Sequence, residues 1–228
     1  MKTIGVLGGL GPQATMDFVS RVHSASRELI PAHANSGYPP MIVYYCRFPP
    51  VLLNNDGTPQ QPVAPEPKLL DAAQTLGGVA DFLVIPSNTP HLLQEHIEHA
   101  SGRKVLSMID ITVSHILRKH YQRVGVLGFH EPTVYTRPLS GLGIACHTCD
   151  PSIATRLNAA IRNVMEGSAD ASDRAAARDA VQDLRAQAVE AIILGCTEIP
   201  LLLHVPETED DLINPAQLLA QATVRHAL

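Results

Sequence analysis

Two short apolar runs, each preceded by an acid and followed by polar residues, stand out along the chain. The first covers residues 82–85 and leads into Pro-Ser-Asn-Thr, and the second covers residues 191–194 and leads into Gly-Cys-Thr-Glu. Short, uninterrupted apolar runs are typical of strands buried inside a parallel sheet. Each run therefore predicts a strand whose carboxyl end carries a nucleophilic side chain, Ser87 in the first case and Cys196 in the second.

A second pair of apolar segments, residues 4–8 and 124–128, shares the sequence Gly-Val-Leu-Gly. The two pairs are offset by about 110 to 120 residues, which indicates two copies of one α/β unit. We therefore predict an α/β fold of two pseudo-symmetric, Rossmann-like domains with parallel-sheet cores. The first domain would comprise residues 1–117 plus 210–228, and the second residues 118–209. Because open α/β sheets bind ligands beyond the carboxyl ends of their strands, the active site is expected in the cleft between the domains.

Periodicity and turn residues complete both predicted units. The pattern predicts further strands over 41–45, 105–109 and 143–146, and helices over 68–77, 112–120, 153–166, 172–189 and 215–228. Thr89 is expected to cap a helix that begins with Pro90. Residues 48–67 are rich in Pro, Asn and Gly, and we interpret them as a long loop that serves either as a lid or as a partner contact.

The composition of the chain argues against several classes of function. The chain has 228 residues, of which 45% are hydrophobic and 17% charged, as is ordinary for a globular protein. A net charge of −5, 4% aromatic residues and no Trp argue against nucleic-acid binding. No apolar run approaches the roughly 20 residues that cross a bilayer. The amino terminus offers no signal-peptide region and the four cysteines form no disulfide framework, so a cytoplasmic location without membrane association is expected.

Two motifs suggest cofactors or metals and are interpreted otherwise. Gly9, Gly11 and Ala14 match the G-x-G-x-x-A dinucleotide fingerprint, but the next strand ends in Cys46-Arg47 and lacks the acid that would hold a ribose. We interpret this turn as a set of amides facing a small anion, and we expect no cofactor. The Cys-x-x-Cys at 146–149 has no second pair to complete a zinc site, so no metal is expected.

The two predicted nucleophiles differ in their chemistry. A thiol has a reference pKa near 8.5, which helix amides can lower, so Cys196 is expected to act as a general base near neutral pH. Ser87 would more readily donate a proton or hold a substrate. His91 lies one helical turn beyond Ser87 and either orients or activates that hydroxyl or is an ordinary residue at a helix start.

Three segments together resemble the aspartate/glutamate racemase superfamily: Gly8–Thr15, Ser87–His91 and Gly195–Glu198. The resemblance implies a cofactor-independent amino-acid racemase or epimerase, in which Cys196 transfers the α-proton on one face of the substrate and Ser87 acts on the opposite face. It also implies a homodimer that acts on a small carboxylic or amino acid. The substrate-binding residues implied by the motifs, with Arg47 as the candidate clamp for a side-chain carboxylate, are Gly9, Leu10, Gly11, Arg47, Asn88, Thr89, Thr197 and Glu198.

The sequence departs from the family pattern at two places. The first motif usually begins with Cys, and here it begins with Ser87, although some relatives use a hydroxyl residue there. Residues 48–51 and 164–167 lack the Arg and Lys that clamp the side chain in aspartate-specific members. Two alternatives stay open: a one-thiol decarboxylase or carboxylate isomerase of the same superfamily, and a non-catalytic binder of small acids.

Overall fold

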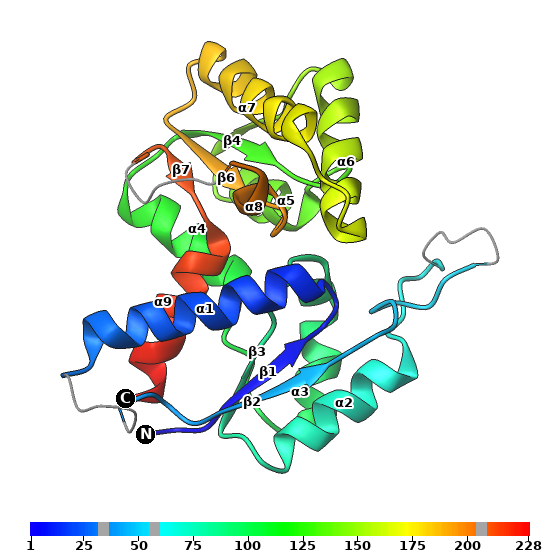
Figure 1. The fold of residues 1–228 in the computed structure, drawn as a ribbon, viewed down its shortest axis with the longest axis vertical. Helices are drawn as coiled ribbons and strands as arrows, with labels where there is room; N and C mark the ends of the chain where they lie inside the picture. Colours follow the sequence, from blue (N-terminus) through cyan, green and yellow to red (C-terminus); the bar gives the residue numbers. More distant parts are fainter. Residues whose placement is uncertain (32–36, 55–59, 204–208) are drawn as a thin grey trace. The chain divides into compact units, whose positions relative to one another are not determined.

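The fold consists of two compact α/β units. The structure is a computed structural model that describes residues 1–31, 37–54, 60–203 and 209–228. Contacts group Met1–Met108 with Ala216–Leu228 into the first unit, and Ile109–Pro215 into the second. Each unit contains one parallel sheet (Figure 1), which confirms the predicted fold class.

The first sheet has the order β2-β1-β3, formed by Met41–Tyr45, Ile4–Gly8 and Phe82–Val84. Strands β1 and β3 are buried at every position, which explains their unbroken apolar sequences. Strand β2 lies at the edge and is only partly covered. The helices of this unit are α1 (Pro12–Leu29), α2 (Pro67–Gly77), the 3₁₀-helix η1 (Thr89–Leu93), α3 (Gln94–Ser101) and α9 (Pro215–Ala227).

The second sheet has the order β5-β4-β6-β7, formed by Ala145–His147, Arg123–Leu127, Ala191–Leu194 and Leu212–Ile213. All of its pairings are parallel. The helices of this unit are α4 (Met108–Arg118), α5 (Thr133–Gly141), α6 (Pro151–Glu166), α7 (Ala171–Ala186) and α8 (Ile199–Leu203).

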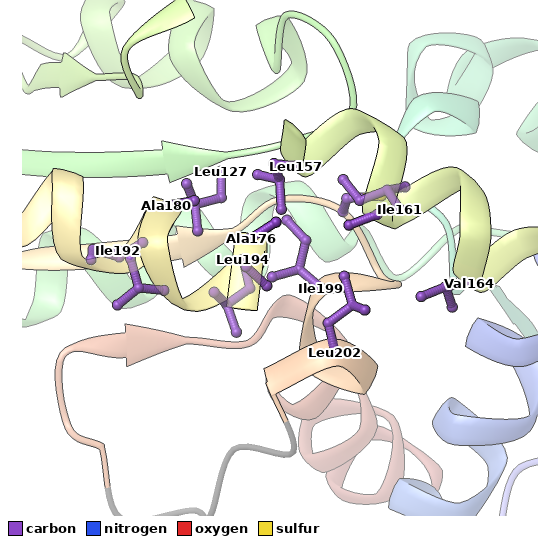
Figure 2. Close-up of a cluster of buried hydrophobic side chains, with 14 of the residues drawn as sticks. Leu127, Leu157, Ile161, Val164, Ala176, Ala180, Ile192, Leu194, Ile199 and Leu202 are labelled. Carbon is purple, nitrogen blue, oxygen red and sulfur yellow. The ribbon is translucent and has the colours of Figure 1, made fainter. Parts of the chain in front are cut away.

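One buried cluster joins helices α6, α7 and α8 of the second unit to its sheet (Figure 2). Helix α7 presents small side chains such as Ala176 and Ala180, which allow α6 to approach with Leu157 and Ile161. Both helices begin with a capping aspartate, and in α7 Asp170 forms a full capping box. These caps and the apolar faces explain why the two segments fold as long helices.

The two sheets repeat one arrangement. In each, the first strand lies between the second and third, and the chain then adds a fourth position beside the third strand. In the second unit that position is strand β7, and in the first it is a single parallel bridge between Val105 and Leu83. The strand predicted over 105–109 is therefore wrong, because only Val105 pairs and helix α4 begins at Met108.

The unit boundaries differ from the predicted domain boundaries. The contacts divide the chain after Met108 and after Pro215, whereas the sequence suggested divisions after residues 117 and 209. Helix α4 belongs to the second unit, and so does β7, because Leu212 and Ile213 pair with β6. Among the residues that the structure describes, no helix combines the length and the apolar character that a membrane span requires.

Candidate active site

Both candidate nucleophiles follow equivalent strands. Ser87 lies beyond the carboxyl end of β3, and Cys196 lies beyond the carboxyl end of β6. In each sheet this third strand neighbours the first, and the chain leaves the first strand toward the opposite edge. Such a reversal of strand order is the place where open α/β sheets bind ligands. Each unit therefore contributes one such position.

The turn between β1 and α1 is stabilised by contacts inside the first unit. Gly9 has φ = +77°, and a Cβ at this residue would lie 2.6 Å from the backbone nitrogen of Cys46. Its N–H donates to the Thr15 hydroxyl at 2.9 Å, and that hydroxyl donates to the Gly11 carbonyl at 2.9 Å. Gly11 is the N-cap of α1 and Leu10 is partly buried against the core of this unit. The Gly9 amide predicted to face an anion is thus bonded to Thr15.

The segment after β3 forms a tight turn around Ser87. Ser87 is partly buried, Asn88 is buried and Thr89 is exposed. The N-cap of the following helix is Asn88 and not Thr89, and the helix is of the 3₁₀ type. Within the described part of the chain, no hydrogen-bond partner of the Ser87 hydroxyl is observed.

His91 positions the backbone of this turn. Its Nδ1 lies 2.9 Å from the carbonyl oxygen of Ser87, and its Nε2 lies 3.1 Å from the backbone nitrogen of Met108. Since the Met108 N–H donates to Nε2, the network assigns the proton to Nδ1, which donates to Ser87. The ring therefore holds the main chain of Ser87. Its role toward the hydroxyl stays a prediction, as does the alternative of an ordinary residue at a helix start.

The end of β2 is apolar next to Arg47. Cys46 is fully buried, and burial raises its thiol pKa to about 11. Phe48 packs against the core of the first unit together with Leu10, whereas Arg47 is exposed. Arg47 forms no ion pair with any residue that the structure describes. The predicted carboxylate clamp is thus a solvent-accessible cation.

The segment after β6 places a thiol against a carboxylate. The Cys196 thiol donates to Glu198 Oε2 across 3.0 Å, and the Thr197 hydroxyl donates to the same oxygen at 3.1 Å. All three residues are buried. The Cys196 and Thr197 side chains of the second predicted motif therefore bond to the same carboxylate oxygen. Glu198, which was predicted to bind substrate, accepts hydrogen bonds from these two neighbours.

The pKa of the Cys196 thiol is shifted in the direction opposite to the one expected from the sequence. Burial raises the pKa of the thiol well above its usual value, and the charge of Glu198 and the hydrogen bond to it raise it further. The backbone N–H groups of Glu198 and Phe129 act in the opposite direction and are outweighed. The prediction of a lowered pKa is wrong, because amides contribute less here than burial beside a carboxylate.

A buried tyrosine supports the turn that carries Cys196. A Cβ at Gly195 would lie 2.6 Å from the carbonyl oxygen of Leu127 and 3.2 Å from the ring of Tyr135. Only glycine fits between that strand and that ring. Burial raises the pKa of Tyr135, so its hydroxyl stays protonated.

Two residues that support these turns, Thr15 and Tyr135, are not among the residues predicted from the sequence. Thr15 follows Gly11 by four residues, which is the spacing at which a first-turn hydroxyl reaches back to a helix start, so this signal was present. Tyr135 lies in a helix with no motif of its own, and nothing in the sequence marks it.

Metal ligands do not converge among the described residues, where no group of three His, Cys, Asp or Glu side chains could hold an ion. Cys146 and Cys149 instead direct their thiols toward separate backbone carbonyls, those of Thr136 and Ala180. The described geometry of this Cys-x-x-Cys therefore fits two structural thiols.

Solved structures share this fold along the whole chain. An aspartate racemase from Picrophilus torridus superposes with a TM-score of 0.77 at 21% identity, covering 100% of this chain and 94% of that one. An aspartate racemase homologue from Pyrococcus horikoshii OT3 gives 0.76 at 23% identity, covering 100% and 99%.

Sequence comparison agrees with the fold. The broad specificity amino-acid racemase RacX of Bacillus subtilis (strain 168) is 27% identical to the chain, over 97% of this chain and 96% of its own length. The sequence profile of one family, described as Asp/Glu/Hydantoin racemase, matches residues 7–223. The chain therefore belongs to the Asp/Glu/Hydantoin racemase family, and the predictions of this superfamily and of an isomerase of the amino-acid racemase class are confirmed.

Proposed function

We propose that the chain is a cofactor-independent amino-acid racemase that transfers the α-proton with Cys196 on one face of the substrate and Ser87 on the other. The observation that carries the proposal is the buried hydrogen bond from the Cys196 thiol to Glu198. A proton donor of raised pKa is suited to reprotonate a carbanion, and the adjacent carboxylate can accept the thiol proton when the sulfur must act as a base.

Each direction of racemisation takes one proton from the α-carbon and returns one on the opposite face. When Cys196 is the acid, the Ser87 oxygen, after losing its own proton to solvent, removes the α-proton; the Cys196 proton then moves to the α-carbon and a thiolate remains beside Glu198. When Cys196 is the base, its resting proton first moves to the Glu198 carboxylate, the resulting thiolate removes the α-proton, and the Ser87 hydroxyl donates its proton to the opposite face. The buried Asn88 and the neighbouring Thr89 and Thr197 are the groups we assign to the substrate carboxylate.

The substrates to test include charged and uncharged amino acids. The exposed Arg47 can pair with a side-chain carboxylate, which favours aspartate or glutamate. The apolar surroundings of Leu10 and Phe48 favour an uncharged side chain. The B. subtilis relative is named for broad specificity, so alanine, leucine and lysine belong beside the two acids in the test.

The decisive experiment is exchange of the substrate α-proton with deuterium in heavy water, followed by mass spectrometry and chiral chromatography. Cys196→Ala is expected to reduce both exchange and racemisation about 100-fold to 10,000-fold, the contribution of a positioned acid or base. Cys146→Ser serves as the matched control, because this partly buried thiol lies in β5 and donates to carbonyls across 3.8 and 3.9 Å. Exchange that persists in Cys196→Ala would exclude the proposed role.

One observation favours a second candidate, a one-thiol decarboxylase or carboxylate isomerase. Among the described residues, no side chain forms a hydrogen bond with the Ser87 hydroxyl and so none is seen to accept its proton. Ser87→Ala separates the candidates: loss of racemisation supports transfer on two faces, and retained carbon dioxide release from substituted malonates or isomerisation of maleate supports the one-thiol enzyme.

A further inference from the structure

His130 has a backbone conformation that its place in the fold does not explain. Among the described residues, three that are not glycine have a positive φ: His120 at 59°, His130 at 55° and Ala188 at 55°. His120 and Ala188 each lie two residues beyond the end of a helix, α4 and α7, where a left-handed residue commonly follows. His130 instead follows strand β4, where no helix ends. Residues other than glycine are strained in this conformation, and such residues are concentrated at functional sites.

The side chain of Asn158 holds this conformation. Its Oδ1 accepts a hydrogen bond from the His130 backbone N–H at 2.9 Å. Asn158 is partly buried on α6, next to Leu157 of the apolar cluster, so the acceptor is carried by a helix that is fixed in the core. The backbone of His130 is therefore anchored by a second element, while the residue itself stays exposed.

The imidazole ring of His130 lies against Phe129. The two ring centroids are 4.1 Å apart, and the ring planes are inclined at 57°. Phe129 in turn packs against the apolar cluster of the second unit. The ring nitrogens of His130 form no hydrogen bond with any residue that the structure describes. The ring is thus supported by an aromatic neighbour, and its nitrogens remain available to a ligand.

Strand pairing brings His130 close to the turn that carries Cys196. Strands β4 and β6 are parallel neighbours, and the Gly195 N–H continues their pairing by donating to the Leu127 carbonyl at 2.6 Å. Phe129 lies two residues beyond Leu127, and its backbone N–H donates to the Cys196 thiol. His130 is therefore the residue that directly follows the backbone group in contact with the sulfur.

The chemistry of the ring nitrogens indicates what they would bind. A neutral imidazole donates one hydrogen bond, and a protonated imidazole donates two. Because consecutive Cα atoms are about 3.8 Å apart, the His130 side chain starts one residue away from the amide that contacts the sulfur. An amino acid whose α-carbon meets this sulfur would have a short side chain within reach of the ring. The group that matches a ring N–H is an acceptor oxygen on that side chain.

We propose that His130 is a further substrate-binding residue, which recognises a carboxylate or amide oxygen on the side chain of the amino acid. The inference rests on the proposed function, because that function brings the α-carbon of the substrate to Cys196. It names a residue that selects among side chains, whereas the substrate α-carboxylate is assigned to Asn88, Thr89 and Thr197.

The test compares the affinities for aspartate, asparagine and alanine, measured by isothermal titration calorimetry on the native chain and on His130→Gly. Glycine adopts the left-handed conformation without strain, so this variant is expected to keep the native circular dichroism spectrum. The preference for aspartate over alanine is expected to fall about 10-fold to 100-fold, which is the contribution of one hydrogen bond to a charged group. The preference for asparagine over alanine is expected to fall about 2-fold to 10-fold, as for a neutral hydrogen bond.

His120→Gly is the matched control for the loss of a strained, exposed histidine. His120 has nearly the same φ but precedes β4, at the opposite end of that strand, and its replacement is expected to leave all three affinities unchanged. A native chain that prefers neither aspartate nor asparagine to alanine, or a preference that persists in His130→Gly, would overturn the inference. Because calorimetry needs no turnover, a chain that selects its ligand through His130 without exchanging the α-proton would contradict the proposed function alone.

Discussion

Cys196 and Glu198 show how a site residue depends on its immediate neighbours. The motif Gly-Cys-Thr-Glu identified the thiol, but the sequence alone did not show that the thiol donates to the carboxylate two residues later. Burial of the thiol, together with that contact, raises its pKa, whereas the sequence suggested a lowered one. In the proposed reaction Glu198 acts through Cys196 and is a positioning residue for it.

Removing the charge of Glu198 tests this electrostatic role. In Glu198→Gln the thiol pKa of Cys196 is expected to fall, because the negative charge that opposes the thiolate is lost. Alkylation of Cys196 by iodoacetamide should therefore begin at a lower pH than in the native protein, as measured by peptide mass spectrometry. Cys46 in the same sample is the internal control, since burial alone raises its pKa. An unchanged Cys196 profile would contradict the assigned role of the carboxylate.

Gly9 permits a second test at the level of a single residue. Gly9→Ala is expected to lower the free energy of unfolding by about 1–3 kcal/mol for the positive φ alone, and by more because its Cβ would meet the Cys46 backbone. Gly102→Ala is the matched control, with φ = +63° and no atom within 4 Å of the added Cβ. Urea unfolding should show a larger loss for Gly9→Ala, and equal losses would mean that the turn relaxes around the methyl group.

At the level of the elements, side-chain contacts support strand β7. Arg185 of α7 donates to Asp211 at 2.7 and 2.8 Å and to Glu209 at 2.7 Å, just before the two-residue strand begins. The guanidinium holds the pKa of Asp211 below its ordinary value of 3.8. These contacts fix a strand that is too short to be held by its ladder alone.

The pH dependence of the ion pair between Arg185 and Asp211, here called the Arg185 clamp, follows from the direction of the pKa shift of Asp211. Because the folded pKa of Asp211 is lowered, its stabilising contribution is present above the unfolded pKa near 4 and is lost as the pH falls through the folded value. Arg185→Gln is expected to reduce the loss of stability as the pH falls below the ordinary pKa of Asp, by less than about 1 kcal/mol because the pair is partly exposed. The measurement is thermal unfolding against pH.

A more exposed pair provides the comparison for the clamp. Arg156 and Asp179 are 2.8 Å apart and roughly half exposed. Arg156→Gln is expected to leave the loss of stability at acidic pH unchanged. An equal effect in Arg156→Gln and Arg185→Gln would show that the net charge of the protein, and not the ion pair of Arg185, is responsible.

The elements differ in how well the sequence predicts them. Strands β1, β3, β4 and β6 follow from apolar runs and from the repeat, because every residue in them except Arg123 of β4 is buried. Val105 looks like the start of a strand, but the chain enters α4 at Met108, three residues later. Strand β7 has two residues and no periodicity, so no pattern could have revealed it.

At the scale of the whole molecule, the repeated strand order explains why two distant motifs occupy equivalent places. The sequence predicted this duplication from Gly-Val-Leu-Gly and from the two strand ends, and both sheets have the related order. The boundaries were less predictable, because α4 and β7 join the second unit through contacts that local sequence does not encode.

The burial of the thiols has a consequence for their oxidation. Burial raises the pKa of Cys46 to about 11 and that of Cys149 to about 12, and it is also the main cause of the raised values at Cys146 and Cys196. Peroxide attacks the thiolate and not the thiol, so sulfenic acid should form slowly at every cysteine. A sulfur that stays protonated beside its carboxylate would thus also resist inactivation by oxidants.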